Sequence, residues 1–443
     1  MKWDGRIVAN ALHIPLADEC VQMCVTSPPY YGLRSYAIEP TVWGGNPDCE
    51  HQWLDGDLDE CLFCDAWRGV LGMETSVEMY LEHIVMVFRE VRRVLRKDGV
   101  CFMNLGDSYA QSGGRGFQGS TSQRLGRKNV QSQVRPEQRN PPPGFKAKDL
   151  MMIPHRTAIA LQDDGWWVRN DIVWEKAQCM PESTRDRCTR SHEYVFHLTK
   201  RADYYWDAEA IKEPASADSH ARYSRRRSQM EEYSHETFRY NGMNRPRAAG
   251  VNPKAQAQRS GIKSNESFSA AVKDVVAMRN KRTVWKMAIA GYPEAHFATF
   301  TPELPEICIL AGTSAYGCCS ACGAPYEREL EPSADYAKYL GKSYHDHEAD
   351  TAEGMMQNRG TNNQNKMRDE TGQHCAEYVT KGWKPGCSCA AAVVPCTVLD
   401  IFVGSGTTAM VAEQLNRRWI GLDLGYQDLQ KKRLQNVQKE LAL

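Results

Sequence analysis

The sequence predicts an α/β protein with a mostly parallel sheet, and two stretches carry this prediction. Near the C-terminus, an apolar, β-branched run at 397–402 precedes a glycine turn at 403–408, a helical pattern at 409–417 and a second strand at 418–424. Near the N-terminus, an amphipathic helix at 81–95 precedes a strand at 100–105. Strands that alternate with helices in this way pair in parallel, because the helix returns the chain to the edge where the next strand begins.

The length and composition of the chain argue against a membrane protein. At 443 residues it is long enough for two to three domains of roughly 150 residues each. No stretch approaches the ~18 uninterrupted apolar residues of a membrane helix. The residues that follow Met1 lack the apolar core of a signal peptide. We therefore expect a cytoplasmic protein without a membrane partner.

Charge is balanced over the whole chain, with 55 basic and 55 acidic residues, but two windows are basic. Residues 111–148 contain eight Lys and Arg against one acid, and residues 221–290 contain fifteen against five. Such windows are either solvated loops or a track for a polyanion, since Lys and Arg that displace counterions from phosphates supply most non-specific affinity for nucleic acid. Two of them in one neutral protein favour nucleic acid as the partner.

Two groups of cysteines have the spacing of metal sites. A CxxC turn places two thiolates on one side of a tight bend, as tetrahedral zinc requires, and disulfides are rare in a cytoplasmic chain. Four protein ligands leave no open position for a substrate, so the zinc would be structural; ordinary buried thiols are the alternative. Cys318, His345, His347, His374 and Cys375 remain open as substitute ligands. The predicted quartets are Cys49, His51, Cys61 and Cys64, and Cys319, Cys322, Cys387 and Cys389.

The glycine turn near the C-terminus has the layout of a nucleotide-type site. Glycines let the backbone approach a ligand, and Asp423 follows about 20 residues later, where an acid receives ribose hydroxyls. The glycine spacing differs from the dinucleotide fingerprint, and no lysine follows the glycines as in a P-loop. An adenosine-bearing ligand without a pyrophosphate fits this turn.

Two motifs together give the chain a family resemblance. Residues 400–408, Asp-Ile-Phe-Val-Gly-Ser-Gly-Thr-Thr, resemble the cofactor motif of the DNA amino-methyltransferases, and residues 26–30, Thr-Ser-Pro-Pro-Tyr, resemble their catalytic motif. These enzymes use S-adenosylmethionine to methylate the exocyclic amine of cytosine or adenine. The catalytic motif comes first here, as in the circularly permuted beta class. Residues 171–176 and 181–183, Arg187 and the pair His192-Glu193 are also similar to this class.

The resemblance implies a Rossmann-like methyltransferase fold with a seven-stranded, mostly parallel sheet that is assembled from both chain ends. Residues 1–110 and 150–213 would form the catalytic half, with a zinc insertion at 49–64. Residues 291–317 and 390–443 would form the cofactor-binding half. Three insertions would interrupt these halves: a basic flexible loop at 111–149, the DNA target-recognition region at 214–290 and a second zinc-binding segment at 318–389.

The chemistry of the target amine assigns roles to the catalytic motif. An aromatic amine is a poor nucleophile because its lone pair is delocalised into the ring, so hydrogen-bond acceptors must make the nitrogen more tetrahedral. The Ser27 hydroxyl and the Pro28 carbonyl can each accept an amine hydrogen, and Pro28 and Pro29 hold φ at about −65°. Tyr30 would stack on the base after it is flipped out of double-stranded DNA. Taken alone, the motif could also be a proline-rich turn at a strand end.

The cofactor residues are carried over from the resemblance. Asp423 would bind the ribose hydroxyls, and Asn10 stands where an aspartate commonly meets the adenine amine; its amide carbonyl can still accept that hydrogen bond. For Phe300 and Thr301, core packing is an equal alternative. The predicted set is completed at the turn by Asp400, Phe402, Gly404, Ser405, Gly406 and Thr407.

The base that is methylated is indicated by Ser27. Serine at the first position of this motif is typical of cytosine N4 enzymes and aspartate is typical of adenine N6 enzymes, so we expect cytosine N4, with adenine N6 as the alternative. A non-catalytic zinc-bearing DNA-binding protein would have lost part of these motifs, and RNA or protein methyltransferases usually carry them in the other order. The sequence allows a monomer or a homodimer and leaves the target DNA sequence open. It is also compatible with a partner of a cognate restriction endonuclease, a stand-alone methylase or a phage protein, in a bacterial, archaeal or phage-infected cell.

Overall fold

The computed structural model describes residues 5–33, 38–53, 59–110, 141–179, 181–214, 278–289, 300–334, 378–435 and 437. Most of the predicted basic loop at 111–149 and of the predicted recognition region at 214–290 therefore lies outside the described residues. The chain divides into two units. The first comprises Met1–Ile211, Arg282–Glu327 and Trp383–Leu443, and the second comprises Lys212–Lys281 and Arg328–Gly382.

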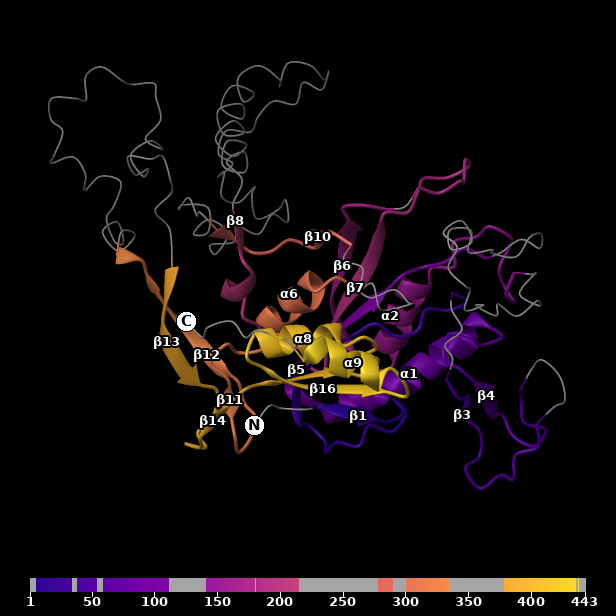
Figure 1. The fold of residues 1–443 in the computed structure, drawn as a ribbon, viewed down its shortest axis with the longest axis horizontal. Coiled ribbons are helices and arrows are strands. Elements are labelled where there is room, and N and C mark those ends of the chain that lie inside the picture. Colours follow the sequence, from indigo (N-terminus) through magenta and orange to yellow (C-terminus); the bar gives the residue numbers. More distant parts are fainter. Residues whose placement is uncertain are drawn as a thin grey trace, which may run out of the picture. The chain divides into compact units, whose positions relative to one another are not determined.

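The first unit is built on a mostly parallel sheet, which confirms the predicted α/β class (Figure 1). β7 runs antiparallel to both of its neighbours, β5 and β6, and the other pairs in the sheet are parallel. In spatial order the strands are β1 (Arg6–Val8), β16 (Arg418–Asp423), β15 (Thr397–Asp400), β2 (Val21–Thr26), β5 (Leu95–Leu105), β7 (His192–Thr199), β6 (Trp167–Lys176) and β10 (Val284–Met287).

The sheet has eight strands, one more than the seven expected. The additional strand is β10, which pairs in parallel with β6. Trp285 and Met287 are buried, whereas Val284 and Lys286 are exposed, which is the alternation of a strand with one covered face. Four residues at the end of a basic, polar window are too short a run for this period to stand out in the sequence.

The centre of the sheet is made from both ends of the chain. β15 pairs with β2 through Val398 with Met23 and Leu399 with Cys24, and these four side chains are buried. This pairing gives the permuted arrangement that the motif order predicted. It also places the carboxyl end of each strand, and the motif that follows it, at the same edge of the sheet.

Helices cover the two faces of this sheet (Figure 1). α1 (Val77–Val94) and α2 (Ile153–Asp163) contribute to one apolar core, while α6 (Glu303–Gly312), α8 (Thr407–Gln414) and α9 (Gln427–Leu434) contribute to the other. The chain after β2 thus leads to a helix on one face, and the chain after β15 leads to a helix on the opposite face. Neighbouring parallel strands with this property leave a crevice outside their carboxyl ends, where ligands bind in open α/β sheets.

α1 shows why these residues form a helix. Ser76 caps it by accepting the backbone N–H of Met79 at 3.1 Å, and Arg92 and Arg93 in the last turn complement the helix dipole. Its apolar residues recur at helical spacing, and Ile84 and Phe88 are fully buried against the sheet. Glu78, Glu82 and Arg89 are exposed on the opposite side of the helix. Within the described residues, no helix combines the length and apolar character of a membrane span.

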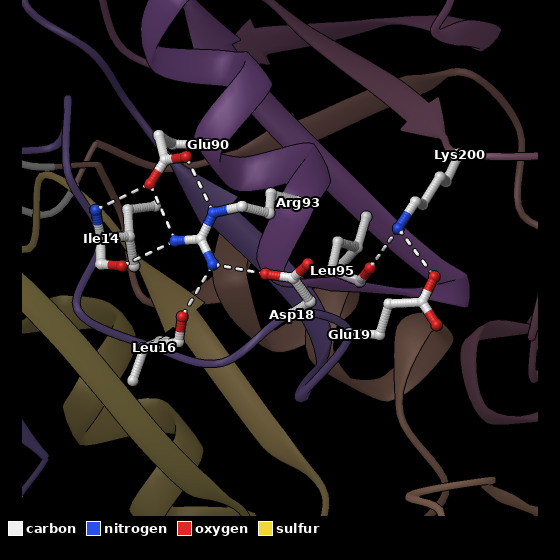
Figure 2. Close-up of polar contacts among 8 residues, drawn as sticks. All are labelled: Ile14, Leu16, Asp18, Glu19, Glu90, Arg93, Leu95 and Lys200. Atoms are coloured by element: carbon white, nitrogen blue, oxygen red, sulfur yellow. Dashed lines mark hydrogen bonds and ion pairs between the residues drawn. The ribbon is translucent and has the colours of Figure 1, made fainter.

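A charged cluster at the end of α1 holds the loop between β1 and β2 (Figure 2). Arg93 donates to the carbonyl oxygens of Ile14 and Leu16, both at 2.8 Å, and to Asp18 at 2.7 Å. Glu90 pairs with Arg93 at 2.8 Å and accepts the N–H of Ile14 at 3.0 Å. The Arg93 guanidinium lowers the pKa of Glu90 below its ordinary value, so the cluster is charged at neutral pH. It fixes the path by which the chain enters β2.

Small two-stranded sheets lie outside the main sheet. Within the first unit, β3 pairs antiparallel with β4 and β11 pairs antiparallel with β14. A 3-10 turn, η2, follows β7. The bounds of these and the remaining elements are β3 (Thr41–Trp43), β4 (Trp67–Gly69), η2 (Glu209–Ile211), β8 (Glu213–Pro214), β9 (Met278–Arg279), β11 (Cys318–Cys319), β12 (Tyr326–Pro332), β13 (Tyr378–Pro385) and β14 (Val393–Val394).

Candidate active site

The predicted catalytic and cofactor motifs meet at the crevice between β2 and β15. Thr26 is the last residue of β2, and Asp400 is the last residue of β15. The Thr26 Oγ1 donates to Asp400 Oδ1 at 2.7 Å, although the two residues are 374 positions apart. Thr408 in α8 donates to the other oxygen, Asp400 Oδ2, at 2.6 Å. One carboxylate therefore joins the end of the catalytic strand to the helix that follows the glycine turn.

Asp400 is fully buried, and its oxygens are engaged by the protein. Burial raises its pKa to about 6, although hydrogen bonds from Thr408, Thr26 and the N–H of Phe402 act in the opposite direction. The Phe402 N–H lies 3.1 Å from Asp400 Oδ1. The Asp400 side chain thus fixes the start of the glycine turn through Phe402 and its end through Thr408.

The glycine turn and Asp423 form one connected structure. Gly404 and Gly406 have φ of 49° and 85°, in the left-handed region that favours glycine. The N–H of Gly404 donates to Asp423 Oδ2 at 2.8 Å, and the N–H of Gly425 donates to Asp423 Oδ1 at 3.0 Å. Asp423 is only partly buried, and each carboxylate oxygen carries a second lone pair. The donor and acceptor set fits an adenosine ligand whose ribose hydroxyls donate to Asp423.

Asn10 lies at the same edge of the sheet as Asp423. Val8 of β1 is the register partner of Asp423, and Asn10 follows two residues later. The Asn10 Oδ1 accepts the N–H of Leu12 at 3.0 Å, and its Nδ2 donates to Thr41 Oγ1 at 3.0 Å. These bonds fix the orientation of the amide and leave one lone pair on Oδ1 for a further donor.

The remaining predicted cofactor residues are mostly packed. Thr301 is buried and its carbonyl accepts the N–H of Leu304 at 3.1 Å, at the start of α6. Phe300 packs, partly buried, against the core formed with α6 and α8. Ser405 and Thr407 are buried, with hydroxyls 3.4 Å apart. At Phe300 and Thr301 the contacts are those of the core-packing alternative.

A polar cluster surrounds the catalytic motif. The Tyr30 Oη lies 3.3 Å from Ser27 Oγ, 3.0 Å from Asn104 Oδ1 and 2.8 Å from Glu193 Oε2. Lys176 forms an ion pair with the other oxygen of Glu193. Asn104 was missed as a site residue in the sequence, and Lys176 and Glu193 were noted only through similarity. The signal that could have identified all three is their position in the strands. They lie at the ends of β5 and β6 and at the start of antiparallel β7, which meet at one edge of the sheet.

The Tyr30 ring is closely confined. A Cβ at Gly106 would lie 2.7 Å from the ring, so glycine is required for this approach. The neighbouring Pro29 carbonyl accepts the Tyr80 hydroxyl at 2.9 Å. Among the described residues, none donates a hydrogen bond to the Pro28 carbonyl. That carbonyl is thus available for the acceptor role predicted for it.

A buried histidine connects the β3–β4 hairpin to the catalytic loop. The His83 ring stacks on Trp43 and Trp67, with centroids 4.6 Å and 5.4 Å away. Its Nδ1 lies 2.9 Å from Glu74 Oε1, and Glu74 Oε2 accepts the N–H of Gly72 at 2.8 Å. The Gly72 carbonyl then accepts a backbone N–H from the turn after the catalytic motif.

The first predicted metal quartet is assembled at this hairpin. The ligand atoms of Cys49, His51, Cys61 and Cys64 lie within 4.8 Å of one another. Cys49 Sγ and Cys61 Sγ are 3.9 Å apart, and Cys64 Sγ is 3.5 Å from His51 Nδ1. Tetrahedral zinc with ordinary bond lengths separates two sulfurs by about 3.8 Å, and a sulfur and a nitrogen by about 3.6 Å. The quartet therefore has the dimensions of a zinc site.

The second predicted quartet is assembled beside β11 and β14. The sulfur atoms of Cys319, Cys322, Cys387 and Cys389 also lie within 4.8 Å of one another, so this group too can hold a metal. Backbone N–H groups of Cys322 and Ala321 lower the pKa of Cys319 to about 6. Cys318 stands apart from the quartet, with its Sγ 3.8 Å from the Pro395 carbonyl. The other substitute ligands considered lie outside the described residues.

The fold and the site define an amino-methyltransferase, and comparison with known proteins places the chain in a family. The model of the N6/N4 DNA methylase family matches residues 21–317 and 396–431. The chain belongs to this family and is a DNA methyltransferase of the class that acts on cytosine N4 or adenine N6.

Similar proteins include two bacterial Type II methyltransferases. M.SmaI of Serratia marcescens is 34% identical over 310 residues, which cover 70% of this chain and 73% of that protein. M.Cfr9I of Citrobacter freundii is 34% identical over 298 residues, which cover 67% and 68%. Among solved structures, the PvuII DNA methyltransferase (cytosine-N4-specific) aligns over 97% of this chain and 86% of its own, with 12% identity and a TM-score of 0.43.

Proposed function

We propose that this DNA methyltransferase transfers the methyl group of S-adenosylmethionine to N4 of a cytosine that is flipped out of double-stranded DNA. The observation that carries the proposal is the Ser27 hydroxyl. It stands directly after β2, at the crevice shared with the glycine turn, and 3.3 Å from Tyr30 Oη. Serine in this position is typical of cytosine N4 enzymes. Adenine N6 methylation in the same geometry is the alternative.

S-adenosylmethionine supplies a methyl group that is already activated by its sulfonium. Asp423 would accept the ribose hydroxyls, the turn would pass beneath the methionine part, and Asn10 would meet the adenine amine. This leaves the protein to align the amine with the methyl group for in-line attack, and such alignment can supply much of the rate enhancement. Asp400, Phe402, Ser405 and Thr407 would act by holding Gly404 and Gly406 in place.

Ser27, Pro28 and Tyr30 would handle the base. The Ser27 hydroxyl and the free Pro28 carbonyl each accept one amine hydrogen, which draws the nitrogen out of conjugation with the ring. Tyr30, held against Gly106, stacks on the base and offsets part of the few kcal/mol that flipping costs.

We also propose structural zinc in both quartets, with DNA recognition by residues 214–290. The distances in the first quartet support zinc, and four protein ligands close each site to substrate. The relatives named above are Type II methyltransferases, which supports a role beside a restriction endonuclease that cuts the same target sequence.

The test is methylation of unmodified plasmid DNA with tritiated cofactor, followed by digestion and mass spectrometry of the nucleosides. We expect N4-methylcytosine from the wild type and a loss of roughly 10²-fold or more in Ser27→Ala, because one acceptor for the amine is removed. Cofactor binding and thermal unfolding of Ser27→Ala serve as controls for folding. Detection of N6-methyladenine would change the target base from cytosine to adenine. Absence of both methylated nucleosides under conditions where the cofactor binds would overturn the proposal.

A further inference from the structure

The polar cluster behind Ser27 forms a hydrogen-bond chain that ends on a carboxylate. Glu193 accepts from Tyr30 Oη at 2.8 Å, from Asn104 Nδ2 at 3.2 Å and from the Lys176 ammonium. An ionised carboxylate accepts hydrogen bonds and donates none. Tyr30, Asn104 and Lys176 can therefore each direct a hydrogen toward Glu193.

The same direction of hydrogen-bond donation applies to the Ser27 hydroxyl. Tyr30 has one hydroxyl hydrogen, and when it is given to Glu193 the Tyr30 oxygen accepts the hydrogen of Ser27, 3.3 Å away. The lone pairs of Ser27 Oγ then remain for the amine of the target base. Without an acceptor behind Tyr30, the Ser27 hydrogen could point at the amine and oppose its approach.

Asn104 and Lys176 maintain this arrangement. Asn104 Nδ2 also donates to the Tyr194 carbonyl at 3.1 Å, which fixes the amide so that its Oδ1 faces Tyr30 as a second acceptor. The Lys176 ammonium lies over the Trp174 ring, 5.2 Å from its centroid, and pairs with the Glu193 oxygen that Tyr30 does not use.

We propose that Glu193 is the end of a proton relay that orients Ser27 as an acceptor and takes up the proton released by the methylated amine. The proposal rests on the amine methylation proposed above. The N–C bond forms as the S–C bond of the donor breaks, whose electron pair stays on sulfur, and the nitrogen becomes cationic. It gives one proton to Ser27 Oγ, Ser27 passes its own to Tyr30, and Tyr30 passes its own to Glu193, which becomes a neutral acid. Glu193 is a positioning residue in this scheme, because it acts through Tyr30.

The test is a double-mutant cycle of Tyr30→Phe and Glu193→Gln, measured as kcat and KM for DNA and for cofactor. Phenylalanine keeps the stacking ring but interrupts the chain, and glutamine can donate to Tyr30 and reverse it. We expect each single variant to lose roughly 10²-fold in kcat with little change in either KM. The double variant should be no slower than the slower single variant, because Glu193 can no longer act once the hydroxyl of Tyr30 is missing. Glu327→Gln removes an exposed pair with Lys384 and is the matched control.

Three results would contradict the relay. Losses that multiply in the double variant would mean that Glu193 acts independently of Tyr30, as a packing partner of Lys176. A Glu193→Gln enzyme with wild-type kcat, or with its loss confined to KM, would also overturn it. If the wild type methylates DNA but the variants give any of these results, the relay alone is refuted. If the wild type methylates no nucleoside, the proposed function is refuted and the relay with it.

Discussion

Asp400 shows how much of the site depends on a single side chain. It accepts hydrogen bonds from both sides of the crevice, from Thr26 in β2 and from Thr408 in α8, although it is fully buried. A buried carboxylate is stable only when donors surround it, because burial penalises the charged form. The elevated pKa of about 6 shows that these donors offset the penalty only in part.

Asp400 should therefore make folding stability depend on pH. Its pKa rises from an ordinary 3.8 to about 6 on folding, so its contribution is fully present below the lower value and is lost as pH rises through the upper one. Between about pH 5 and pH 8 the loss should be about 1.4 kcal/mol. Burial also lowers the pKa of His197 to about 3, which makes both proteins more stable as pH rises over the same range, so Asp400 is isolated by comparing the two. The free energy of unfolding in urea, measured at both pH values, should fall by about 1.4 kcal/mol more in the wild type than in Asp400→Asn.

Two other carboxylates do not obscure this window. The pKa values of Glu19 and Glu90 are lowered from an ordinary 4.5, so their contributions are lost only as pH falls below that value. Parallel pH dependence in the wild type and the Asn variant would show that Asp400 is ionised throughout the window. The turns that carry the serine and the glycines of the two motifs could be recognised because their sequence signals are local, whereas the burial of Asp400 depends on β2, which lies far away in sequence.

At the scale of the element, α1 and its last turn determine how the chain enters β2. Arg93 connects α1 to two backbone carbonyls, those of Ile14 and Leu16. Arg89, an exposed residue of the same helix, pairs with Asp164. A carbonyl that loses its donor is left partly desolvated, whereas an exposed ion pair contributes little.

Arg93→Ala should therefore destabilise the protein by on the order of 2 kcal/mol, and Arg89→Ala by about 0.5 kcal/mol or less. Urea denaturation at neutral pH measures both on the same helix. Equal losses for the two variants would indicate that the loop between β1 and β2 does not need the Arg93 contacts.

Elements with a long, regular period could be predicted, and short ones could not. α1 and the strands β2, β15 and β16 carry enough apolar residues at one spacing to be recognised. β10, with four residues, and the two-residue strands β11 and β14 become strands only because a partner is present. Asn104 was missed for the same reason, since only the strand order brings it to Tyr30.

The whole molecule should contain two zinc ions if the proposed quartets are both filled. Metal analysis of the purified protein should give about two equivalents, and Cys61→Ser and Cys319→Ser should each lose about one, because a single missing thiolate opens a four-ligand site. Ser320→Ala, beside a ligand but not one itself, should keep both. Well under one equivalent in the wild type would exclude structural zinc from both quartets.

The pairing of β15 with β2 also has a consequence for synthesis of the protein. The ribosome makes the catalytic loop directly after β2, which ends at Thr26, whereas β15 begins only at Thr397. At about 5 to 20 residues per second, N-terminal segments wait for tens of seconds before their central partner strand appears. Until then Thr26 lacks Asp400, and the sheet has an open gap at its middle. Methylating activity can therefore appear only after β15 has been synthesised, and a chain that terminates before β15 cannot mark DNA.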